Sequence, residues 1–450
     1  MRDAKVRRQP PDQTRQVGDR SREGSRRVEH AGTATTQERT PTGTTINNHA
    51  RPTRHANTAD VARPDVPAEA ADVARPNGHA DIADIVLPDS RAEIAEVAGP
   101  DLLADVAGPV QQLSLTEDDQ PGPTLSRADV EDAARYLEGQ IVRTPVLRSP
   151  VLDRIAGARL LVKAENLQLS GSYKMRGATV AVGRLAAAGT DTGVICQSTG
   201  NHAQAVALAA RRHGLAATVV LPRDAPAGKV AQARAAGARV ILAGTSVEER
   251  LDVVRQVRAE TGHAVIDAYD HRDVVAGQGT AALELIDAAE RLGVPLDALV
   301  VPVGGGGGAA GACLAAAGRG IDVYGVEPVG CDSLAQSLAA GRRVPVPPAP
   351  TLADGLRPTC VGALPFGILR AAGARVVRVD DAAIADAFRL VLMQLKLLAE
   401  PSGAAAVAGA LRIAAPGTYR TVGVVLTGGN VEAALVARLM STTDQEGSPA

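Results

Sequence analysis

The hydrophobic pattern after residue 125 alternates between helical stretches and short aliphatic runs. The stretch LSRADVEDAARYL carries apolar residues at helical spacing, and Ser126 is its expected N-cap. Aliphatic runs then alternate with alanine-rich helical segments; the runs are ATVVLP, RVILAG, ALVVPV, DVYGVEP and VGVVLT. This order predicts an α/β fold of parallel sheets covered by helices on both faces. Ligands of such sheets bind at the carboxyl ends of the strands, so unusual loops there should mark the site.

The pattern before residue 125 is different. Residues 1–55 contain very few aliphatic side chains, and residues 59–109 repeat a proline-ended unit such as ADVARP, mostly with a 12-residue period. Such segments bury too little apolar surface to offset the entropy lost on ordering. We expect a long disordered, low-complexity tail over 1–124, a folded domain over 125–442, and a short disordered tail over 443–450.

Composition excludes several partners. The 450-residue chain has a net charge of −2 and 2% aromatic residues, which disfavours nucleic acid as a partner. No apolar run follows the basic N-terminus, and the uncharged stretch 298–318 is broken by proline and glycines, so neither export nor a membrane span is expected. The four cysteines are widely spaced, which favours a reducing, cytoplasmic location.

A glycine run follows the strand ALVVPV. Gly304, Gly305, Gly306, Gly307 and Gly308 lie between this strand and an apolar helical segment. Glycines let successive backbone N–H groups converge, and a helix start adds positive potential, so the loop predicts a phosphate site. The same loop also fits a dinucleotide fingerprint, with Glu327 at the end of the next strand as the ribose-binding acid. The loop alone therefore leaves both ligands open.

Two further loops carry candidate chemistry. Ser198, Thr199, Gly200 and Asn201 follow a strand expected to end at Cys196, and they open a helix whose N–H groups suit a carboxylate. Such residues are also ordinary helix caps. In SGSYKMRGA, Lys174 stands in a loop between apolar segments, where burial would lower its pKa and make it a nucleophilic amine. A phosphate site, a carboxylate site and such an amine together indicate pyridoxal phosphate acting on an amino acid.

Eight motifs then resemble one family in the order in which they occur. They are KAENLQLSGSYKMRGA, STGNHAQAVA, DHRDVVAGQGT, PVGGGGG, GVEP, TLADGLRP, KLLAEPSGAAAVAGAL and LTGGN. Over about residues 125–440 the chain resembles the serine/threonine dehydratases and serine racemases that use pyridoxal phosphate. The resemblance implies that residues 125–442 form a catalytic domain of two subdomains, with the smaller one at about 178–270 inserted in the larger and the cofactor between them. It also implies a homo-oligomer, either a dimer or a tetramer.

The resemblance also implies roles for individual residues. Lys174 is expected to hold the cofactor covalently and to remove the substrate's α-proton. Asn201 is expected to contact the cofactor's ring hydroxyl, Gly304 to Gly308 its phosphate, and Thr427 its pyridine nitrogen. Ser198, Thr199, Asn201 and His202 are expected to orient the substrate carboxylate.

Departures from the family pattern bear on the reaction. Thr199 stands where the racemases have a serine proposed as an acid/base, which weakens racemisation as an expectation. Metal-binding relatives have a glutamate where this chain has Glu327 and a carboxylate six residues later, where this chain has Ser333 with Asp332 one step away. The resemblance therefore leaves a divalent cation at Glu327 open. The expected reaction is elimination of water from L-threonine or L-serine, giving a 2-oxoacid and ammonia. Alternatives are serine racemisation, dehydration of another β-hydroxy amino acid such as hydroxyaspartate, and nicotinamide-dependent oxidation.

Overall fold

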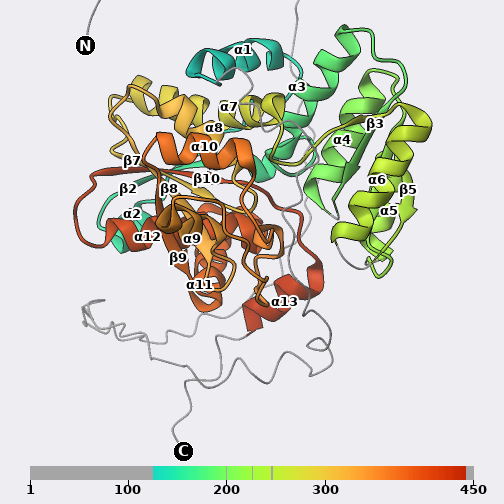
Figure 1. Ribbon diagram of the computed structural model, residues 1–450. Helices are drawn as coiled ribbons and strands as arrows, with labels where there is room; N and C mark the ends of the chain where they lie inside the picture. The colour runs from blue at the N-terminus through green and yellow to red at the C-terminus, as the bar shows by residue number, and fades with distance from the viewer. Residues whose placement is uncertain (1–124, 199, 226, 245–246, 442–450) are drawn as a thin grey trace, which may run out of the picture. The chain divides into compact units, whose positions relative to one another are not determined.

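The computed structural model describes residues 125–198, 200–225, 227–244 and 247–441. The expectations for the two tails and for Thr199 therefore concern residues outside the described ones. The described residues form two β-sheets with helices packed against them (Figure 1). The expected α/β class is confirmed.

The larger sheet has six strands in the order β1-β2-β10-β7-β8-β9. Their bounds are β1 Val146–Leu147, β2 Arg159–Ala164, β7 Ala298–Pro302, β8 Asp322–Pro328, β9 Arg375–Val379 and β10 Thr421–Leu426. Every neighbouring pair is parallel except β1 with β2, which is antiparallel. The residues of β7 and β10 are buried throughout, as expected for central strands covered on both faces.

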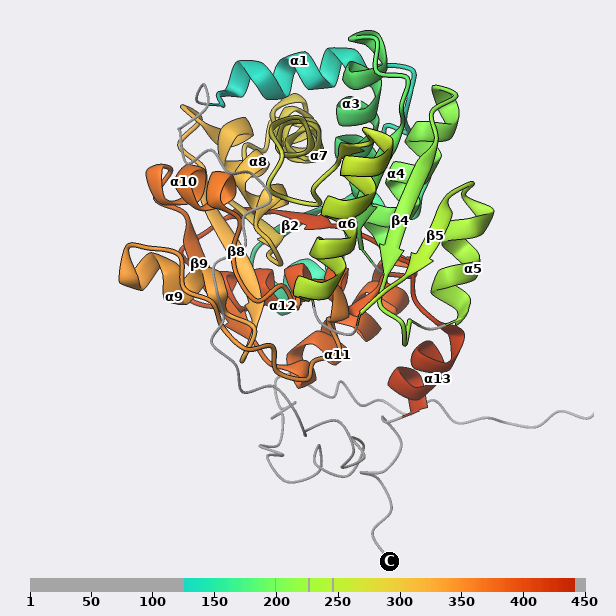
Figure 2. The same ribbon diagram turned by 45° about the vertical axis from the view of Figure 1, so that its right-hand side comes forward.

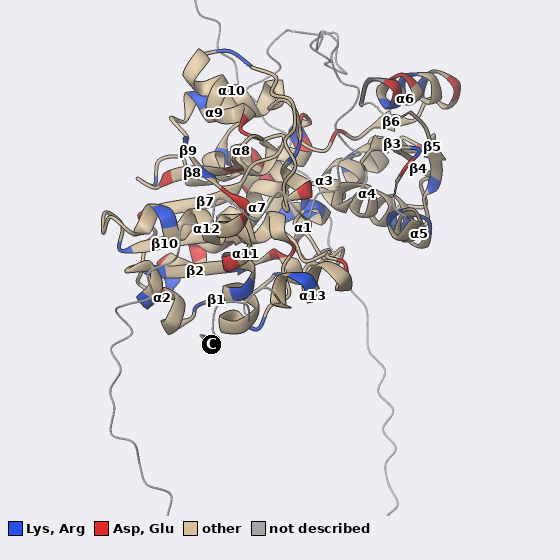
Figure 3. Ribbon diagram, turned by 90° about the horizontal axis from the view of Figure 1, so that it is seen from below, with Lys and Arg blue, Asp and Glu red and all other residues tan. Residues whose placement is uncertain are grey.

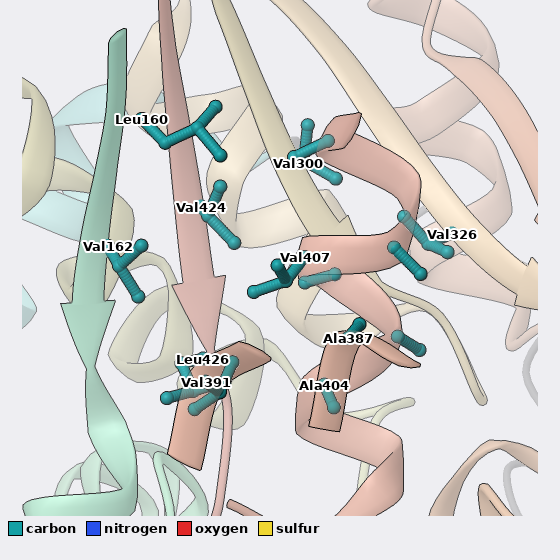
Figure 4. Close-up of a cluster of buried hydrophobic side chains, with 14 of the residues drawn as sticks. Leu160, Val162, Val300, Val326, Ala387, Val391, Ala404, Val407, Val424 and Leu426 are labelled. Atoms are coloured by element: carbon teal, nitrogen blue, oxygen red, sulfur yellow. The ribbon is translucent and has the colours of Figure 1, made fainter. Parts of the chain in front are cut away.

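Two groups of helices cover the two faces of this sheet. One apolar cluster joins the sheet to α1 Arg127–Leu137, α7 Arg272–Arg291, α8 Gly307–Ala316, α9 Ser333–Ala340 and α10 Ala363–Ala371. The other joins it to α2 Pro150–Ala156, α11 Asp381–Leu390, α12 Pro401–Ala414 and α13 Ala433–Ser441. Figure 4 shows part of the second cluster, where Val162, Val424 and Val300 point toward Val407 of α12. Successive strand residues point to opposite faces, so Leu160 and Leu161 belong to different clusters.

The smaller sheet is entirely parallel, in the order β5-β4-β3-β6. Its strands are β3 Val194–Gln197, β4 Ala217–Leu221, β5 Arg239–Leu242 and β6 Ala264–Val265, and its helices are α3 Lys174–Ala187, α4 Asn201–Arg212, α5 Ala227–Ala235 and α6 Val247–Thr261. Helix α6 packs on one side of β4 and β5 while α5 lies on the other (Figure 2). The strands fall within 178–270, and the boundary of a smaller subdomain there stays a prediction.

Several local details differ from the sequence-based expectation. Lys174 does not lie in a loop but begins α3, and α8 begins inside the glycine run at Gly307. Strand β3 extends one residue beyond Cys196, to Gln197, because it pairs with β4 as far as Val220. Short helical turns η4 Glu165–Leu167, η5 Asp354–Leu356 and η6 Val391–Leu395 complete the described elements.

Charged residues of both signs are interspersed among the described elements (Figure 3). Stretch 298–318 forms β7, the glycine loop and α8, as the sequence predicts. No helix among the described residues combines the length and the apolar character needed to cross a membrane.

Candidate active site

Segments far apart in the sequence meet at the carboxyl ends of β10 and β3. Ser172 pairs with Gly428 in an isolated antiparallel bridge, and Tyr173 N donates to Thr427 O at 2.9 Å. On the other side, Lys174 Nζ donates to the carbonyl of Ala268, which follows β6, at 2.8 Å. The loop before α3 is thus held between the ends of strands from both sheets, which brings Lys174 close to Thr427.

Lys174 has the electrostatics of a reactive amine. Burial lowers its pKa to about 8, while the nearby carboxylates of Asp267 and Glu400 act in the opposite direction. The ammonium lies 5.3 Å from the centre of the Tyr173 ring. A lysine with this pKa is partly neutral near physiological pH, and only the neutral amine can attack a carbonyl group.

The glycine loop is a site for a ligand that accepts backbone hydrogen bonds. Helix α8 begins at Gly307, and its first N–H groups have no intrahelical acceptor. Gly306 has φ of +90°, a conformation that side chains other than glycine rarely adopt. A Cβ on Gly305 would overlap the Tyr269 ring, and one on Gly308 would overlap the Tyr173 ring. Glycine is therefore required here by close packing as well as by backbone conformation, and the arrangement suits a phosphate group.

Asn201, the first residue of α4, lies in a chain of polar side chains. Its Nδ2 donates to Glu400 Oε1 at 2.8 Å, and its Oδ1 accepts from Asn430 Nδ2 at 2.7 Å. Ser198 accepts from Gly200 N through its hydroxyl at 3.3 Å, as in a local turn. This chain brings the loop after β3 beside LTGGN, so Asn201 and Thr427 lie at one site.

His202 is placed differently from the other expected carboxylate ligands. Its ring is buried, and Nε2 lies 2.9 Å from the carbonyl oxygen of Ile266. Burial and the charge of Lys174 lower its pKa to about 3, so the ring is neutral. Nδ1 is buried and has no hydrogen-bond partner among the described residues. His202 thus anchors α4 to β6, and its role toward a substrate stays a prediction.

Residues that the sequence reasoning did not single out complete the site. Glu400 is 8% exposed and directly precedes α12. Its burial is the main cause, and the charge of Asp354 the second, of a pKa raised to about 8. Asp267 accepts from the backbone N–H groups of Tyr269 and Asp270. Glu400 and Asn430 belong to the motifs KLLAEPSGAAAVAGAL and LTGGN, so the sequence carries the signal, although the motifs alone assign neither residue a role. A single carboxylate in an apolar segment before a proline is the feature that marks Glu400.

The Glu327 carboxylate is hydrogen-bonded to backbone N–H groups of the protein. Its carboxylate accepts from Leu334 N at 2.8 Å and Ala335 N at 2.9 Å, which caps α9. Burial raises its pKa to about 7. The described residues contain no group of three or more His, Cys, Asp or Glu side chains that could hold a metal ion. A divalent cation at Glu327 stays a prediction.

The residues present fit pyridoxal 5'-phosphate. The glycine loop and the start of α8 suit its phosphate, and Lys174 offers an amine for its aldehyde. Thr427 O accepts from Tyr173 N next to Lys174, and Asn201 bonds to Glu400, whose charge acts on Lys174. The Ser172 hydroxyl, two residues before Lys174, is fully buried without a hydrogen-bond partner among the described residues. Buried hydroxyl groups are normally hydrogen-bonded, so this one indicates room for a polar ligand atom.

Comparisons with known proteins agree with this fit. Residues 137–428 match the family model described as pyridoxal-phosphate dependent enzyme. An L-threo-3-hydroxyaspartate ammonia-lyase from Pseudomonas sp is 40% identical over 69% of this chain and 97% of its own length. The structure of maize serine racemase aligns with a TM-score of 0.67 and 35% identity over 71% of this chain and 97% of that chain. The serine racemase of Dictyostelium discoideum aligns with a TM-score of 0.65 and 36% identity over 69% and 100%. The chain therefore belongs to the family of pyridoxal-phosphate-dependent enzymes, with pyridoxal 5'-phosphate as its cofactor.

Proposed function

We propose that this enzyme is an ammonia-lyase that acts on a small β-hydroxy amino acid, L-threonine or L-serine. The observation that carries the proposal is the Lys174 amine, which donates to Ala268 O at 2.8 Å and has a pKa of about 8, next to Tyr173, whose ring packs against Gly308 of the glycine loop. Bound pyridoxal phosphate supplies an electron sink that stabilises negative charge at the substrate's α-carbon. Lys174 can accept the α-proton because its neutral form is populated near pH 8.

Other residues are proposed to bind the cofactor and to orient the substrate. Ser198, Thr199, Asn201 and His202 are proposed to hold the substrate carboxylate at the α4 start, where the helix dipole favours negative charge. The N–H groups of Gly304 to Gly308 are proposed to hold the cofactor phosphate. Thr427 is proposed to face the pyridine nitrogen with a neutral hydroxyl, which does not enforce protonation of that nitrogen.

The overall reaction balances without an oxidant or reductant. The α-proton and the β-hydroxyl group leave as water, and the released enamine is hydrolysed to a 2-oxoacid and ammonia. Membership of the family favours this over nicotinamide-dependent oxidation, for which Glu327 would have to bind a ribose. That carboxylate is instead used by two N–H groups of α9.

A second candidate substrate is L-threo-3-hydroxyaspartate, because the Pseudomonas relative at 40% identity carries that name. Both candidates are tested by incubating the protein, loaded with pyridoxal phosphate, with L-threonine, L-serine and L-threo-3-hydroxyaspartate. Formation of oxoacid and ammonia in equal amounts is expected for the substrate. Formation of D-serine without oxoacid, seen by chiral chromatography, would replace the proposal by racemisation.

We also propose a homo-oligomer in a reducing, cytoplasmic compartment. Leu167, Leu169 and Leu398 are each more than 40% exposed, and Asn166 Nδ2 donates to the carbonyl of Leu398, so this apolar surface joins two segments. Exposed apolar patches are typical of interaction surfaces. The four cysteines of the chain are unpaired, as expected in a reducing compartment. Light scattering on the purified protein tests the oligomer, and a mass equal to one chain would contradict it.

A further inference from the structure

The side chains of Asn430, Asn201 and Glu400 form a hydrogen-bonded chain beside Lys174. Asn430 Nδ2 donates to Ser170 O at 2.8 Å and to Asn201 Oδ1 at 2.7 Å. Asn201 Nδ2 then donates to Glu400 Oε1 at 2.8 Å. Four segments that lie far apart in the sequence are joined through these contacts.

The backbone carbonyl of Ser170, which can only accept hydrogen bonds, fixes the orientation of both carboxamides. A backbone carbonyl such as that of Ser170 cannot donate, so the Asn430 atom facing it must be the nitrogen. That nitrogen also faces Asn201, which requires the oxygen of Asn201 on that side. The nitrogen of Asn201 then lies on the side of Glu400, where it donates to Oε1. The backbone carbonyl of Ser170 therefore fixes the orientation of the Asn201 carboxamide through Asn430, and the contact with Glu400 agrees with it.

Two glycines provide the space that this chain occupies. A Cβ on Gly428 would overlap Glu400 Oε1 and lie 3.2 Å from Asn201 Nδ2. A Cβ on Gly171 would overlap Asn430 Oδ1, and Gly171 also has φ of +71°. Glu400 is further held by its backbone N–H, which donates to Gly428 O at 3.0 Å. Gly428 thus lies directly against both the Glu400 carboxyl group and Asn201 Nδ2, where only a residue without a side chain fits.

We propose that Glu400 is a positioning residue for the cofactor and acts through Asn201. With Asn430, it fixes the Asn201 carboxamide so that the second hydrogen on Nδ2 is available for the cofactor's ring hydroxyl oxygen. This inference rests on the proposed function, together with the contact between Asn201 and the cofactor's ring hydroxyl that the family resemblance implies.

The protonation state of Glu400 depends on the charged groups around it. Burial raises the pKa of Glu400 most, and the charge of Asp354 raises it further. The hydrogen bond from Asn201 and the charges of Lys229 and Lys174 lower it. Lys229 Nζ pairs with Asp354 at 3.0 Å, which partly compensates for the like charge. With its pKa raised to about 8, Glu400 is mostly uncharged at neutral pH, and its Oε1 accepts from Asn201 as a neutral oxygen, which the amide oxygen of a glutamine can replace.

The test uses the visible absorption band and the dissociation constant of pyridoxal phosphate, both measured without substrate. Glu400→Leu removes the acceptor, so the band should shift and the dissociation constant should rise by about tenfold, as for loss of one hydrogen bond. Glu400→Gln keeps an amide oxygen that can accept from Asn201. It should retain the wild-type band, and a Gln variant that behaves like the Leu variant would contradict the proposal.

A double-mutant cycle separates positioning from a general structural role. In an Asn201→Ala background, Glu400→Leu should cause no further band shift, because the group through which it acts is gone. Equal shifts in both backgrounds would overturn the proposal. Asp380→Leu, which removes the capping carboxylate of α11, is the matched control for lost helix stability, and it should leave the band unchanged.

Asn430→Leu provides a second approach if Glu400→Leu does not fold, since Asn430 is exposed. It removes the donor to Asn201 Oδ1 and should shift the band in the same direction; an unchanged band would contradict the proposal. Failure of the positioning role and failure of the proposed function give different experimental results. A wild-type protein that makes no oxoacid would refute the lyase while the cycle still holds, and an active lyase with an additive cycle would refute the positioning role alone.

Discussion

Lys174 is proposed to serve both as the covalent anchor of the cofactor and as the base that accepts the α-proton, so its replacement should remove both roles. In Lys174→Ala no amine remains at this position to hold the cofactor covalently or to accept the α-proton. Oxoacid production should fall by orders of magnitude, and the effects of the two roles should not add because one group serves both. Borohydride reduction followed by peptide mass mapping measures the covalent attachment.

The matched control for this experiment is Lys163, the buried lysine of β2. It donates to Glu284 at 2.6 Å and to Thr144 O at 2.6 Å, and so it is held in an ion pair. Cofactor trapped on Lys163, or near-normal turnover by Lys174→Ala, would show that the assignment of Lys174 is wrong. Weak, non-covalent cofactor binding by the variant is expected, since the glycine loop is unchanged.

The lowered pKa of Lys174 predicts how covalent loading depends on pH. Only the neutral amine attacks the cofactor's aldehyde, so the loading rate of cofactor-free protein should rise with pH and level off above about pH 8. Asp267→Asn removes a carboxylate that raises this pKa, so the midpoint should move to lower pH. The accepting Oδ1 is kept in that variant. Stopped-flow absorbance measures the rate, and a midpoint near the ordinary lysine pKa of about 10 would show that the amine behaves as an exposed lysine.

At the scale of elements, a buried ion cluster holds the start of α3. Arg176, two residues after Lys174, donates to Glu165 at 2.8 Å and to Glu284 at 2.9 Å, and its side chain is fully buried. Glu165 follows β2 and Glu284 lies on α7, so one guanidinium joins three elements. Its planar fork makes paired hydrogen bonds that an ammonium group cannot reproduce.

Arg176→Met should therefore lower the free energy of unfolding by about 3–5 kcal/mol, because the buried Glu165 and the partly buried Glu284 both lose the guanidinium. Arg176→Lys keeps the charge but loses the fork, and it should fall between wild type and Arg176→Met. Urea unfolding followed by circular dichroism measures the change.

An exposed arginine supplies the comparison for this experiment. Arg127 pairs with Glu131 at 2.8 Å on the exposed face of α1, and Arg127→Met should change the free energy by less than about 1 kcal/mol. If Arg176→Met were as stable as wild type, the cluster would contribute no more than apolar packing.

At the scale of the whole molecule, the proposed chemistry is confined to residues 165–430. A chain that begins at residue 121 should therefore keep its cofactor content and turnover nearly unchanged. Both are measured on the truncated and full-length proteins side by side, at equal protein concentration. Loss of cofactor on truncation would show that residues 1–120 contribute to the catalytic body.

The sequence by itself determined the fold class and most of the expected site. Aliphatic runs of strand length between helical stretches are local patterns, so they report parallel sheets covered by helices without long-range information. Lys174, the glycine run and the STGNH segment stand out because each is unusual for its own neighbourhood. The family resemblance added roles for Asn201 and Thr427.

Only the tertiary structure decided which distant residues meet. Glu400 and Asn430 lie 199 and 229 positions from Asn201, yet both contact its carboxamide. Their meeting depends on strand order, with β10 between β2 and β7. The buried strands β2, β7 and β10 have similar aliphatic sequences, so the pattern of hydrophobic residues does not reveal which of them are neighbours. The placement of a carboxylate beside Asn201 is thus a consequence of sheet topology, which local sequence does not encode.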